Sequence, residues 1–564
     1  MTTSIGDATS PLSGAQALVE AFETLGVELV FGLPGVHNLA LWEALHSSDI
    51  RLVGTRHEQG AVYAADGLAR VTGRLGVALT TTGPGAANTL GATGEAWSVG
   101  SPVLVIATDI PTSLRRPGVH RGALHETRDQ GAMFAPVVKR VVRVRRGDDV
   151  EAQLLDAAAV ALAAPSGPVY VEIPTDLLSA PQGATRPLPS VTRPPSPDPQ
   201  AVGEAGGLLR GANRPLMWVG SGAVRSDAGI AVAALAERLG APVIETYGAR
   251  GLLPLDHPCR IGVPPHVEEV GRLWDEADVV VAVGTDFDGM MTQNWRMPQP
   301  AALIAVNVDA ADIGKSYAAD VALVGDARQV VEALVAQLPV RSAPDAVPER
   351  LEAIRAATRR HIEADEPGAL ELLDAVQQAV TPRDAVVFAD MCIPGYWVAG
   401  FHPFASSRRL GYPVGWGTLG FGFPASLGAA LAGPSPVLCI TGDGGIMFAL
   451  SELATVAQER IPVTILLVDD GGYGMLRFDQ EHAGAQTFGV DLKAPDWAGV
   501  ATSFGIAVRE IDGFGAPLGA MLGELLDSHE PSLVVVRAAL RPPVTTSPRW
   551  YRPPALPASG GVGA

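Results

Sequence analysis

Two short segments near the C-terminus combine acidic residues with glycines in a pattern suited to chemistry. They are Thr441-Gly442-Asp443-Gly444-Gly445 and Asp469-Asp470-Gly471-Gly472-Tyr473-Gly474. The apolar run 463–468 between them predicts a buried parallel strand, so Asp443 and Asp470 should each follow a strand, at the edge where open α/β sheets bind ligands. Carboxylate oxygens suit a hard cation such as Mg²⁺, and the glycines allow close backbone approach to a diphosphate. The two segments therefore predict a metal–diphosphate site.

The elements that must position these residues occur twice in the chain. Residues 437–444 predict a strand and a glycine-rich turn, followed by a helix over 446–459 and a strand over 461–466. Residues 77–85 and 101–106 repeat this pattern around another helical stretch. Each copy is the strand–helix–strand unit of a parallel sheet. The repeat predicts two similar α/β domains that face each other with a ligand between them.

Two proline-rich segments, 181–199 and about 339–348, divide the chain into three blocks. The predicted domains are 1–180, 195–340 and 350–545, followed by a Pro/Gly-rich tail over 546–564. In the middle block, apolar runs lead into Gly220-Ser221-Gly222 and into Gly284, which predicts another doubly wound domain. A single Gly-X-Gly is a weak dinucleotide signal, and tight turns without a ligand are the favoured interpretation.

Composition limits the classes of partner. The 564 residues are 47% hydrophobic and 18% charged, with a formal net charge of −19. An acidic balance argues against nucleic acid and anionic membranes as partners. The three cysteines, Cys259, Cys392 and Cys439, are scattered without metal spacing, which favours a reducing, cytoplasmic location. We expect no signal peptide in residues 1–13 and no membrane span.

Further motifs stand in order along the chain. They read Phe31-Gly32-Leu33-Pro34-Gly35, Arg56-His57-Glu58-Gln59-Gly60-Ala61, Thr82-Gly83-Pro84-Gly85-Ala86-Ala87-Asn88 and Gly417-Thr418-Leu419-Gly420. Together with the Asp443–Asp470 spacing, they make residues 13–540 resemble the acetolactate synthase branch of the thiamine diphosphate (ThDP)-dependent enzymes. The resemblance implies an α/β fold of three doubly wound parallel-sheet domains: pyrimidine-binding, central Rossmann-like and diphosphate-binding.

The resemblance also implies a role for each motif. Glu58 would hydrogen-bond N1′ of the aminopyrimidine and so promote loss of the thiazolium C2 proton; its plain alternative is to cap a helix. Asp443, Asp470 and the carbonyl of Gly472 would hold Mg²⁺. The remaining cofactor contacts would come from Gly444 and Gly445 at the diphosphate, Gly417 and Leu419 at the pyrimidine and the bend of the cofactor, and Pro34, Thr82, Asn88 and Met475.

Several positions depart from the family pattern. Asp470 replaces the usual asparagine, which keeps an oxygen ligand but adds a charge beside the diphosphate. The stretches 262–266 and 284–290 lack the arginines that would meet FAD phosphates, so we expect no FAD. Phe478-Asp479-Gln480 replaces Gln-Trp-Gln, and Cys392-Ile393-Pro394-Gly395 replaces Gly-Gln-His-Gln. These changes weaken the case for acetolactate synthesis itself.

Two histidines could move protons near the reacting atoms. His37 follows the Pro34-Gly35 turn, and His125 stands where related decarboxylases have a His-His pair and synthases a Gln-Glu pair. A neutral imidazole is suited to proton delivery, although a hydrogen-bonded structural histidine is the alternative at both positions.

The leading function implied by the resemblance is decarboxylation of a small, pyruvate-like 2-oxo acid and ligation of the resulting enamine to an aldehyde or a second 2-oxo acid. A decarboxylase that releases an aldehyde is the alternative, and a silent cofactor-binding relative is a remote one. Because Glu58 and the metal site come from different subunits in this family, the resemblance implies at least a homodimer and commonly a homotetramer.

Overall fold

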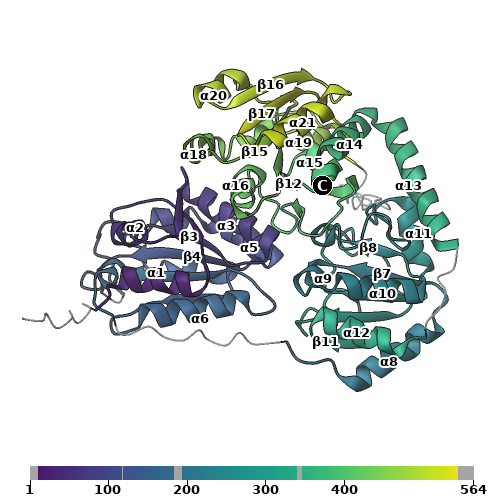
Figure 1. Ribbon diagram of the computed structural model, residues 1–564, viewed down its shortest axis with the longest axis horizontal. Coiled ribbons are helices and arrows are strands. Elements are labelled where there is room, and N and C mark those ends of the chain that lie inside the picture. Colours follow the sequence, from purple (N-terminus) through teal and green to yellow (C-terminus); the bar gives the residue numbers. More distant parts are fainter. Residues whose placement is uncertain (1–10, 117, 183–193, 340–345, 544–564) are drawn as a thin grey trace, which may run out of the picture.

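Runs of apolar residues, many of them β-branched, form the strands of three parallel sheets. The computed structural model describes residues 11–116, 118–182, 194–339 and 346–543, and each sheet forms the centre of one of three lobes (Figure 1). Helices cover both faces of each sheet, so the central strands are buried and need no polar alternation. The α/β class with three doubly wound domains is confirmed.

The N-terminal sheet has the order β2-β1-β3-β4-β6-β5, with all pairs parallel. Its strands are β1 Leu29–Gly32, β2 Arg51–Gly54, β3 Gly76–Thr80, β4 Val103–Asp109, β5 Arg140–Arg143 and β6 Val169–Pro174. One face packs against α1 Gly14–Thr24, α2 Leu39–His46 and α6 Val150–Leu162. The other face packs against α3 Glu58–Thr72 and α5 Leu90–Val99. Because the strand order reverses between β1 and β3, the loops after these strands form the ligand edge.

The C-terminal sheet repeats this plan in the order β13-β12-β14-β15-β17-β16. Its strands are β12 Val386–Ala389, β13 Leu410–Gly411, β14 Val437–Gly442, β15 Val463–Asp469, β16 Ala507–Asp512 and β17 Ser532–Arg537. One face packs against α14 Pro367–Val380, α15 Ile393–Phe401 and α21 Pro517–Ser528, and the other against α16 Gly422–Ala432 and α20 Trp497–Ser503. The shared strand order agrees with the sequence repeat, and the reversal falls between β12 and β14.

The central sheet has five parallel strands in the order β11-β10-β9-β7-β8. They are β7 Pro215–Val219, β8 Val243–Glu245, β9 Val279–Val283, β10 Leu303–Asn307 and β11 Val321–Val324. Helices α8 Pro199–Gly211, α10 Gly229–Leu239 and α12 Ala327–Gln337 cover one face, and α11 Glu268–Glu276 covers the other. Helix α13, Ala346–Asp365, then packs into the core shared with the C-terminal domain.

Helices α3 and α16 join the two outer domains where they cross, and their backbones are in direct contact there. A Cβ on Gly67 would lie 1.9 Å from the carbonyl oxygen of Ala425, and one on Gly428 would lie 1.8 Å from that of Ala64. The two helices share one buried cluster that draws on both outer sheets. Small residues are therefore required at this crossing, and they fix how the two domains sit together.

Two local expectations from the sequence need adjustment. The helix expected over 446–459 is interrupted: α17 covers Asp443–Ile446, a 3₁₀ turn covers Leu450–Glu452, and α18 covers Leu453–Glu459. The extended segment expected to run to 199 ends earlier, because Asp198 caps α8, which begins at Pro199. Residues 183–193, 340–345 and 544–564, which include two of the predicted boundaries and the tail, lie outside the described residues.

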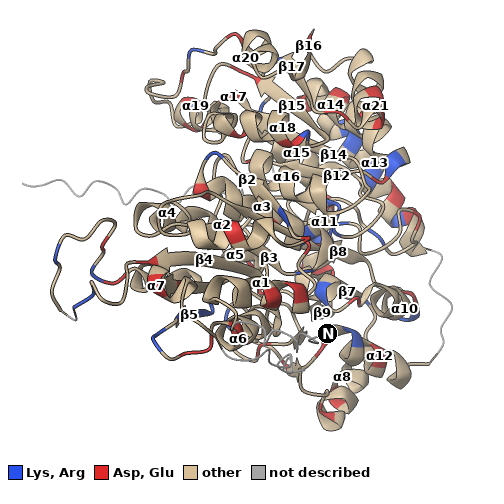
Figure 2. Ribbon diagram, turned by 60° about the vertical axis from the view of Figure 1, so that its left-hand side comes forward, with Lys and Arg blue, Asp and Glu red and all other residues tan. Residues whose placement is uncertain are grey.

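Charged residues of both signs are scattered over all three lobes (Figure 2). Across the ranges that the structure describes, no helix combines the length and apolarity that crossing a membrane requires.

Candidate active site

Glu58 is buried at the first position of α3, on the N-terminal domain. Its side chain is 7% exposed, and the amide nitrogen of Asn88, just after α4 (Pro84–Ala87), donates to its Oε2 at 3.0 Å. The helix is capped by the neighbouring His57, whose Nδ1 accepts from the backbone N–H of Gln59 at 3.2 Å. The capping role that could explain a glutamate here therefore belongs to His57, and the Glu58 carboxylate is directed to Asn88.

The loops after β1 and β3 bring together four of the predicted residues: Pro34, His37, Thr82 and Asn88. His37 Nδ1 lies 2.8 Å from the hydroxyl oxygen of Thr82, and Thr82 donates onward to Thr108 at 2.9 Å. Because the strand order reverses between these two strands, the group occupies the ligand edge of the sheet.

The two histidines singled out from the sequence meet at this edge. The rings of His37 and His125 lie 5.3 Å apart in an edge-to-face arrangement. Burial, and then the nearby His125, lower the pKa of His37, which favours its neutral form. His125 has a positive φ of 64°, and its buried Nδ1 has no hydrogen-bond partner among the described residues. A left-handed backbone at a bulky residue is a strained arrangement that functional sites often retain.

Asp443 and Asp470 follow the neighbouring parallel strands β14 and β15 on the C-terminal domain. Asp443 is 2% exposed, and neither carboxylate oxygen has a hydrogen-bond partner within the described ranges. Burial, and then the charge of Asp470, raise the pKa of Asp443 to about 7. Burial also raises the pKa of Asp470, which Arg477 partly offsets. A buried carboxylate beside a half-buried one is costly unless a proton or a cation neutralises the pair.

A backbone carbonyl completes the candidate metal site. The carbonyl oxygen of Gly472 lies 3.4 Å from the Cβ position of Gly444, beside Asp443. Gly472 itself has φ +154°, and a Cβ there would meet the carbonyl oxygen of Val490 at 2.2 Å. No group of three His, Cys, Asp or Glu side chains in the described chain could hold a metal, so this set needs the carbonyl. Three oxygen donors, two of them charged, fit the preference of Mg²⁺.

The segment with Gly417 and Leu419 is held from both outer domains. Thr418 donates from its hydroxyl to Glu95 on α5 at 3.2 Å, and the N–H of Gly420 donates to Asp390 at 3.0 Å. Leu419 is half-buried, as is Met475, which lies on α19 (Gly474–His482) and packs against the core of the C-terminal domain. Gly445 packs against the same Asp390 side chain.

Three buried carboxylates at this site were not identified from the sequence: Asp390, Glu95 and Glu452. Asp390 is fully buried after β12, and burial raises its pKa to about 6. Its position after the apolar run 385–389 matches that of Asp443 and could have identified it. Glu95 and Glu452 carry no such signal. Glu95 pairs with Arg70 on α3 and accepts from Thr418 of the other outer domain, and Glu452 accepts from Arg56 of the other outer domain.

The Glu58 group and the Asp443 group stand on different domains of the chain. Within the described part of the molecule, no hydrogen bond or ion pair joins Glu58, Asn88 or the two histidines to Asp443 or Asp470.

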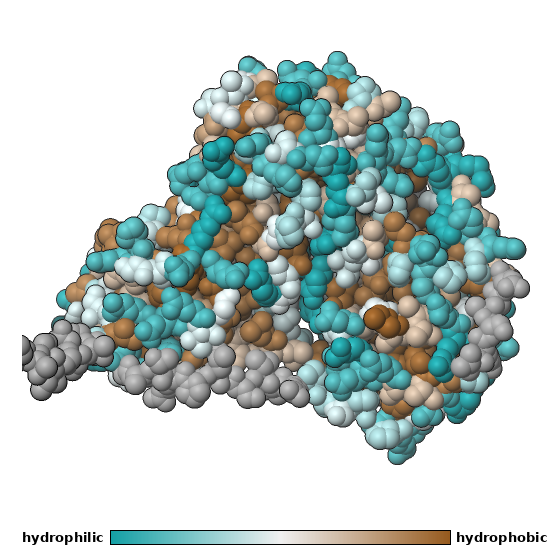
Figure 3. All heavy atoms as spheres, in the orientation of Figure 1, coloured by the Kyte–Doolittle hydropathy of each residue, from teal (hydrophilic) through white to brown (hydrophobic). Residues whose placement is uncertain are grey.

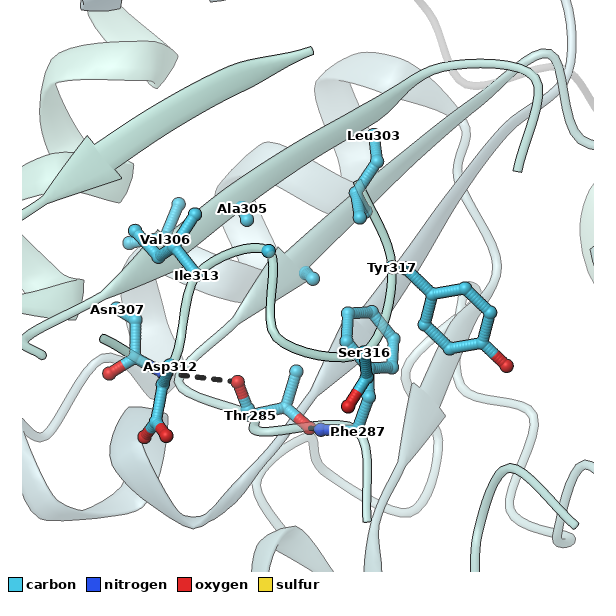
Figure 4. Close-up of a pocket in the computed structure, with 12 residues that line it drawn as sticks. Thr285, Phe287, Leu303, Ala305, Val306, Asn307, Asp312, Ile313, Ser316 and Tyr317 are labelled. Atoms are coloured by element: carbon cyan, nitrogen blue, oxygen red, sulfur yellow. Dashed lines mark hydrogen bonds between the residues drawn. The ribbon is translucent and has the colours of Figure 1, made fainter. Parts of the chain in front are cut away.

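The central domain has its own crevice where the strand order reverses between β7 and β9. A Cβ on Gly220 would lie 2.4 Å from the carbonyl oxygen of Gly284, so the two turns at this edge pack closely and require glycine. The nearby pocket, lined by Thr285, Phe287, Asn307, Asp312 and Tyr317 (Figure 4), is small, and the Asn307 side chain closes it by donating to the carbonyl of Thr285 at 3.1 Å.

Three family models match the chain in order. They are the N-terminal TPP binding domain of thiamine pyrophosphate enzymes over residues 12–133, the central domain over 202–334 and the C-terminal TPP binding domain over 392–536. Thiamine pyrophosphate is the same compound as ThDP.

Similar whole proteins extend the match. The chain is 38% identical to the probable 2-ketoarginine decarboxylase of Pseudomonas aeruginosa, over 88% of this chain and 89% of that protein. It is 31% identical to the probable acetolactate synthase large subunit of Methanocaldococcus jannaschii, over 93% and 91%. It is 32% identical to the acetolactate synthase isozyme 3 large subunit of Escherichia coli, over 88% and 89%. The chain therefore belongs to the thiamine pyrophosphate enzyme family, in the branch that contains the acetolactate synthase large subunits.

Proposed function

We propose that the protein uses ThDP and Mg²⁺ to decarboxylate a small 2-oxo acid and to ligate the remaining acyl unit to a second carbonyl compound. The observation that carries the proposal is the buried Asp443, with both carboxylate oxygens unpartnered beside Asp470. A divalent cation held by these side chains and the carbonyl of Gly472 would bind the cofactor's diphosphate. The acetolactate synthase relatives support the ligation step.

The chain's own residues would divide the work. When bound, ThDP supplies the electron sink for decarboxylation. Glu58 would hold a proton at the aminopyrimidine, with Asn88 fixing its carboxylate. Gly417, Leu419, Met475, Pro34 and Thr82 would orient the cofactor, and Gly444 and Gly445 would give the diphosphate access to the backbone.

A second candidate function is decarboxylation followed by protonation, with release of an aldehyde. Two observations favour it: His37 and His125 lie in edge-to-face contact, and one relative is a probable 2-ketoarginine decarboxylase. An imidazole placed at the reacting carbon can, in its protonated form, deliver a proton before a second carbonyl compound arrives. A silent cofactor-binding protein is disfavoured because a buried Glu58 costs stability unless it has a role.

We propose a homodimer as the smallest active unit and a homotetramer as the full assembly. Glu58 and Asp443 stand in groups that this single chain does not join, so a second copy would complete each site. Apolar surface gathers in the recess between the N-terminal and C-terminal lobes (Figure 3). Exposed apolar residues flank the site segments in the sequence: Val36, Leu39, Trp97, Trp416, Met447 and Phe448. Clusters of this kind mark contact surfaces.

We further propose that the central domain holds no FAD. The lack of arginines in 262–266 and 284–290 supports this proposal. Decarboxylation and ligation need no flavin.

Product analysis tests the function. The protein is incubated with ThDP, Mg²⁺ and ¹³C-pyruvate or 2-ketoarginine, with and without an added aldehyde. Labelled acetolactate or a mixed acyloin from pyruvate supports ligation, whereas aldehyde alone moves the function to the second candidate. CO₂ release from 2-ketoarginine but not from pyruvate would identify the donor acid. No CO₂ from any 2-oxo acid tried, with ThDP bound, would contradict both functions.

A further inference from the structure

We infer that Glu452, from the C-terminal domain, is a positioning residue for Glu58, because its carboxylate fixes the backbone where α3 begins. The inference rests on the role proposed for Glu58 and extends it to the other outer domain of the same chain.

The contacts of Glu452 converge on the two residues that precede Glu58. Both carboxylate oxygens accept from the backbone N–H of Arg56 at 3.1 Å, and Oε1 accepts from that of His57 at 3.0 Å. Glu452 ends the 3₁₀ turn Leu450–Glu452 and is 1% exposed. The hydroxyl of Thr455, on the following helix α18, donates to its Oε2 at 2.6 Å. The carboxylate is therefore held on its own domain and presented to α3.

The Glu452 carboxylate is compensated mainly by backbone N–H donors and has no ion-pair partner among the described residues. Its hydrogen bonds come from the N–H groups of Arg56 and His57 and from the hydroxyl of Thr455, whereas the Arg56 guanidinium donates to Gly54 and Gln458 instead. Burial raises the pKa of Glu452, and the hydrogen bonds lower it. A buried carboxylate without an ion pair is costly, and charge-assisted bonds to N–H groups are the compensation that fixes geometry most tightly.

The chain leaves space for this contact at Gly60, in the first turn of α3. A Cβ on Gly60 would lie 2.6 Å from Glu452 Oε1. Any larger residue would push the carboxylate away from the helix start or turn the helix itself. Since Glu58 lies between His57 and Gly60, both displacements move its carboxylate relative to Asn88.

Amide hydrogen exchange in the cofactor-free protein tests the placement. We compare Glu452→Ala, Glu452→Gln and the control Glu245→Gln. Glu245 is also buried and also accepts from a backbone N–H, that of Leu253 at 3.0 Å, but in the central domain, where it also pairs with Arg260; it therefore controls for loss of a buried charge far from α3. For peptides covering 55–61, exchange should rise about 10-fold in Glu452→Ala and less in Glu452→Gln, whose remaining oxygen still accepts. The control should leave these peptides unchanged.

A second readout connects placement to chemistry. In the loaded enzyme, Glu452→Ala should slow exchange of the ThDP C2 proton by about 10-fold or more, with ThDP affinity within about 3-fold of wild type. Glu452→Gln should restore part of the rate. If Glu452→Ala does not fold, Gly60→Ala displaces the same carboxylate and should give the same two effects.

The outcomes separate the two proposals. If Glu452→Ala loosens residues 55–61 no more than the control does, or loosens them without slowing C2 exchange, the positioning inference is wrong. The variant Glu58→Gln shows whether only the inference fails or the proposed role of Glu58 fails too. If it stops C2 exchange while Glu452→Ala does not change it, only the inference fails. If Glu58→Gln keeps the wild-type rate, the role of Glu58 fails and the inference fails with it.

Discussion

After burial itself, the negative charge of Asp470 is the largest cause that raises the pKa of Asp443 to about 7. The two carboxylates follow neighbouring strands, and both oxygens of Asp443 are unpartnered within the described residues. The protein therefore holds a buried carboxyl beside a half-buried one. Arg477 offsets part of the charge of Asp470, and a bound cation would offset the rest. This pair is the clearest sign of a metal site in the chain.

Replacing either carboxylate should change how ThDP binding depends on metal. Asp443→Ala should weaken ThDP binding in saturating Mg²⁺ by at least about 10-fold, about 1.4 kcal/mol, because the cation loses a charged ligand. Asp470→Asn should keep binding in Mg²⁺ but reduce the ratio of Kd in EDTA to Kd in Mg²⁺, because one charge beside the diphosphate is gone. Titration with ThDP, followed by quenching of the protein's tryptophan fluorescence in Mg²⁺ and in EDTA, measures the Kd of both variants. A ratio of the two Kd values in Asp470→Asn equal to that of wild type would contradict this explanation.

His125 should influence the fate of the acyl unit. His125→Gln removes the group able to deliver a proton and keeps a polar side chain of similar size. We expect the ratio of aldehyde to ligated product to fall by about 10-fold, since general acid catalysis contributes at least this much. Product ratios measured with ¹³C-pyruvate and a fixed aldehyde concentration check it. A ratio equal to that of wild type would make His125 a structural residue.

The crossing of α3 and α16 should not tolerate a larger residue in place of its glycines. Gly428→Ala places a Cβ 1.8 Å from the carbonyl oxygen of Ala64 and should lower the thermal midpoint by several degrees or prevent folding. Gly203→Ala is the matched control, because nothing lies within 4 Å of its Cβ position in helix α8. That change should raise stability slightly, by about 0.5–1 kcal/mol. Equal midpoints for the two variants would show that the helices separate easily.

His402 should make the protein sensitive to acid. Both ring nitrogens are buried without a partner in the described structure, and burial, with Arg250 and Arg260 nearby, lowers the pKa of His402 to about 3. Between pH 6.5 and pH 3 the unfolded chain binds a proton here that the folded chain does not, so the free energy of unfolding falls as pH falls.

The variant His402→Leu isolates this contribution. It lacks the titrating group, so its stability relative to wild type should improve by up to about 1.4 kcal/mol for each pH unit below 6.5. Thermal midpoints of both proteins at pH 7.5, 6.0 and 5.0 measure the change. If the two proteins lose the same stability on acidification, His402 is not the group responsible.

Local sequence patterns were sufficient for the strands and the acidic ligands. Asp443 and Asp470 could be placed because each follows an apolar run, and parallel strands end at one edge of a sheet. The repeat also predicted two similar domains, which the common strand order of the outer sheets matches. The break between α17 and α18 was missed, because nothing in the composition of 446–459 opposes a continuous helix.

Contacts between domains could not be predicted in this way. Glu452 contacts Arg56 and Glu95 contacts Thr418 across hundreds of residues, and no local spacing encodes either pair. Gly67 and Gly428 look like ordinary helix glycines until α3 and α16 are seen to cross there. No hydrogen bond or ion pair joins the Glu58 group to the Asp443 group among the described residues, and no local pattern says how the two groups would meet.

The most direct test of the account is the exchange of the ThDP C2 proton in Glu58→Gln compared with wild type, followed by NMR after acid quench. Glu58 is buried, and its Oε2 is held by Asn88 at 3.0 Å, so the change to an amide alters the proton chemistry with little change of shape. We predict that exchange slows by about 100-fold or more while ThDP still binds. Exchange near the wild-type rate would contradict the central role of Glu58.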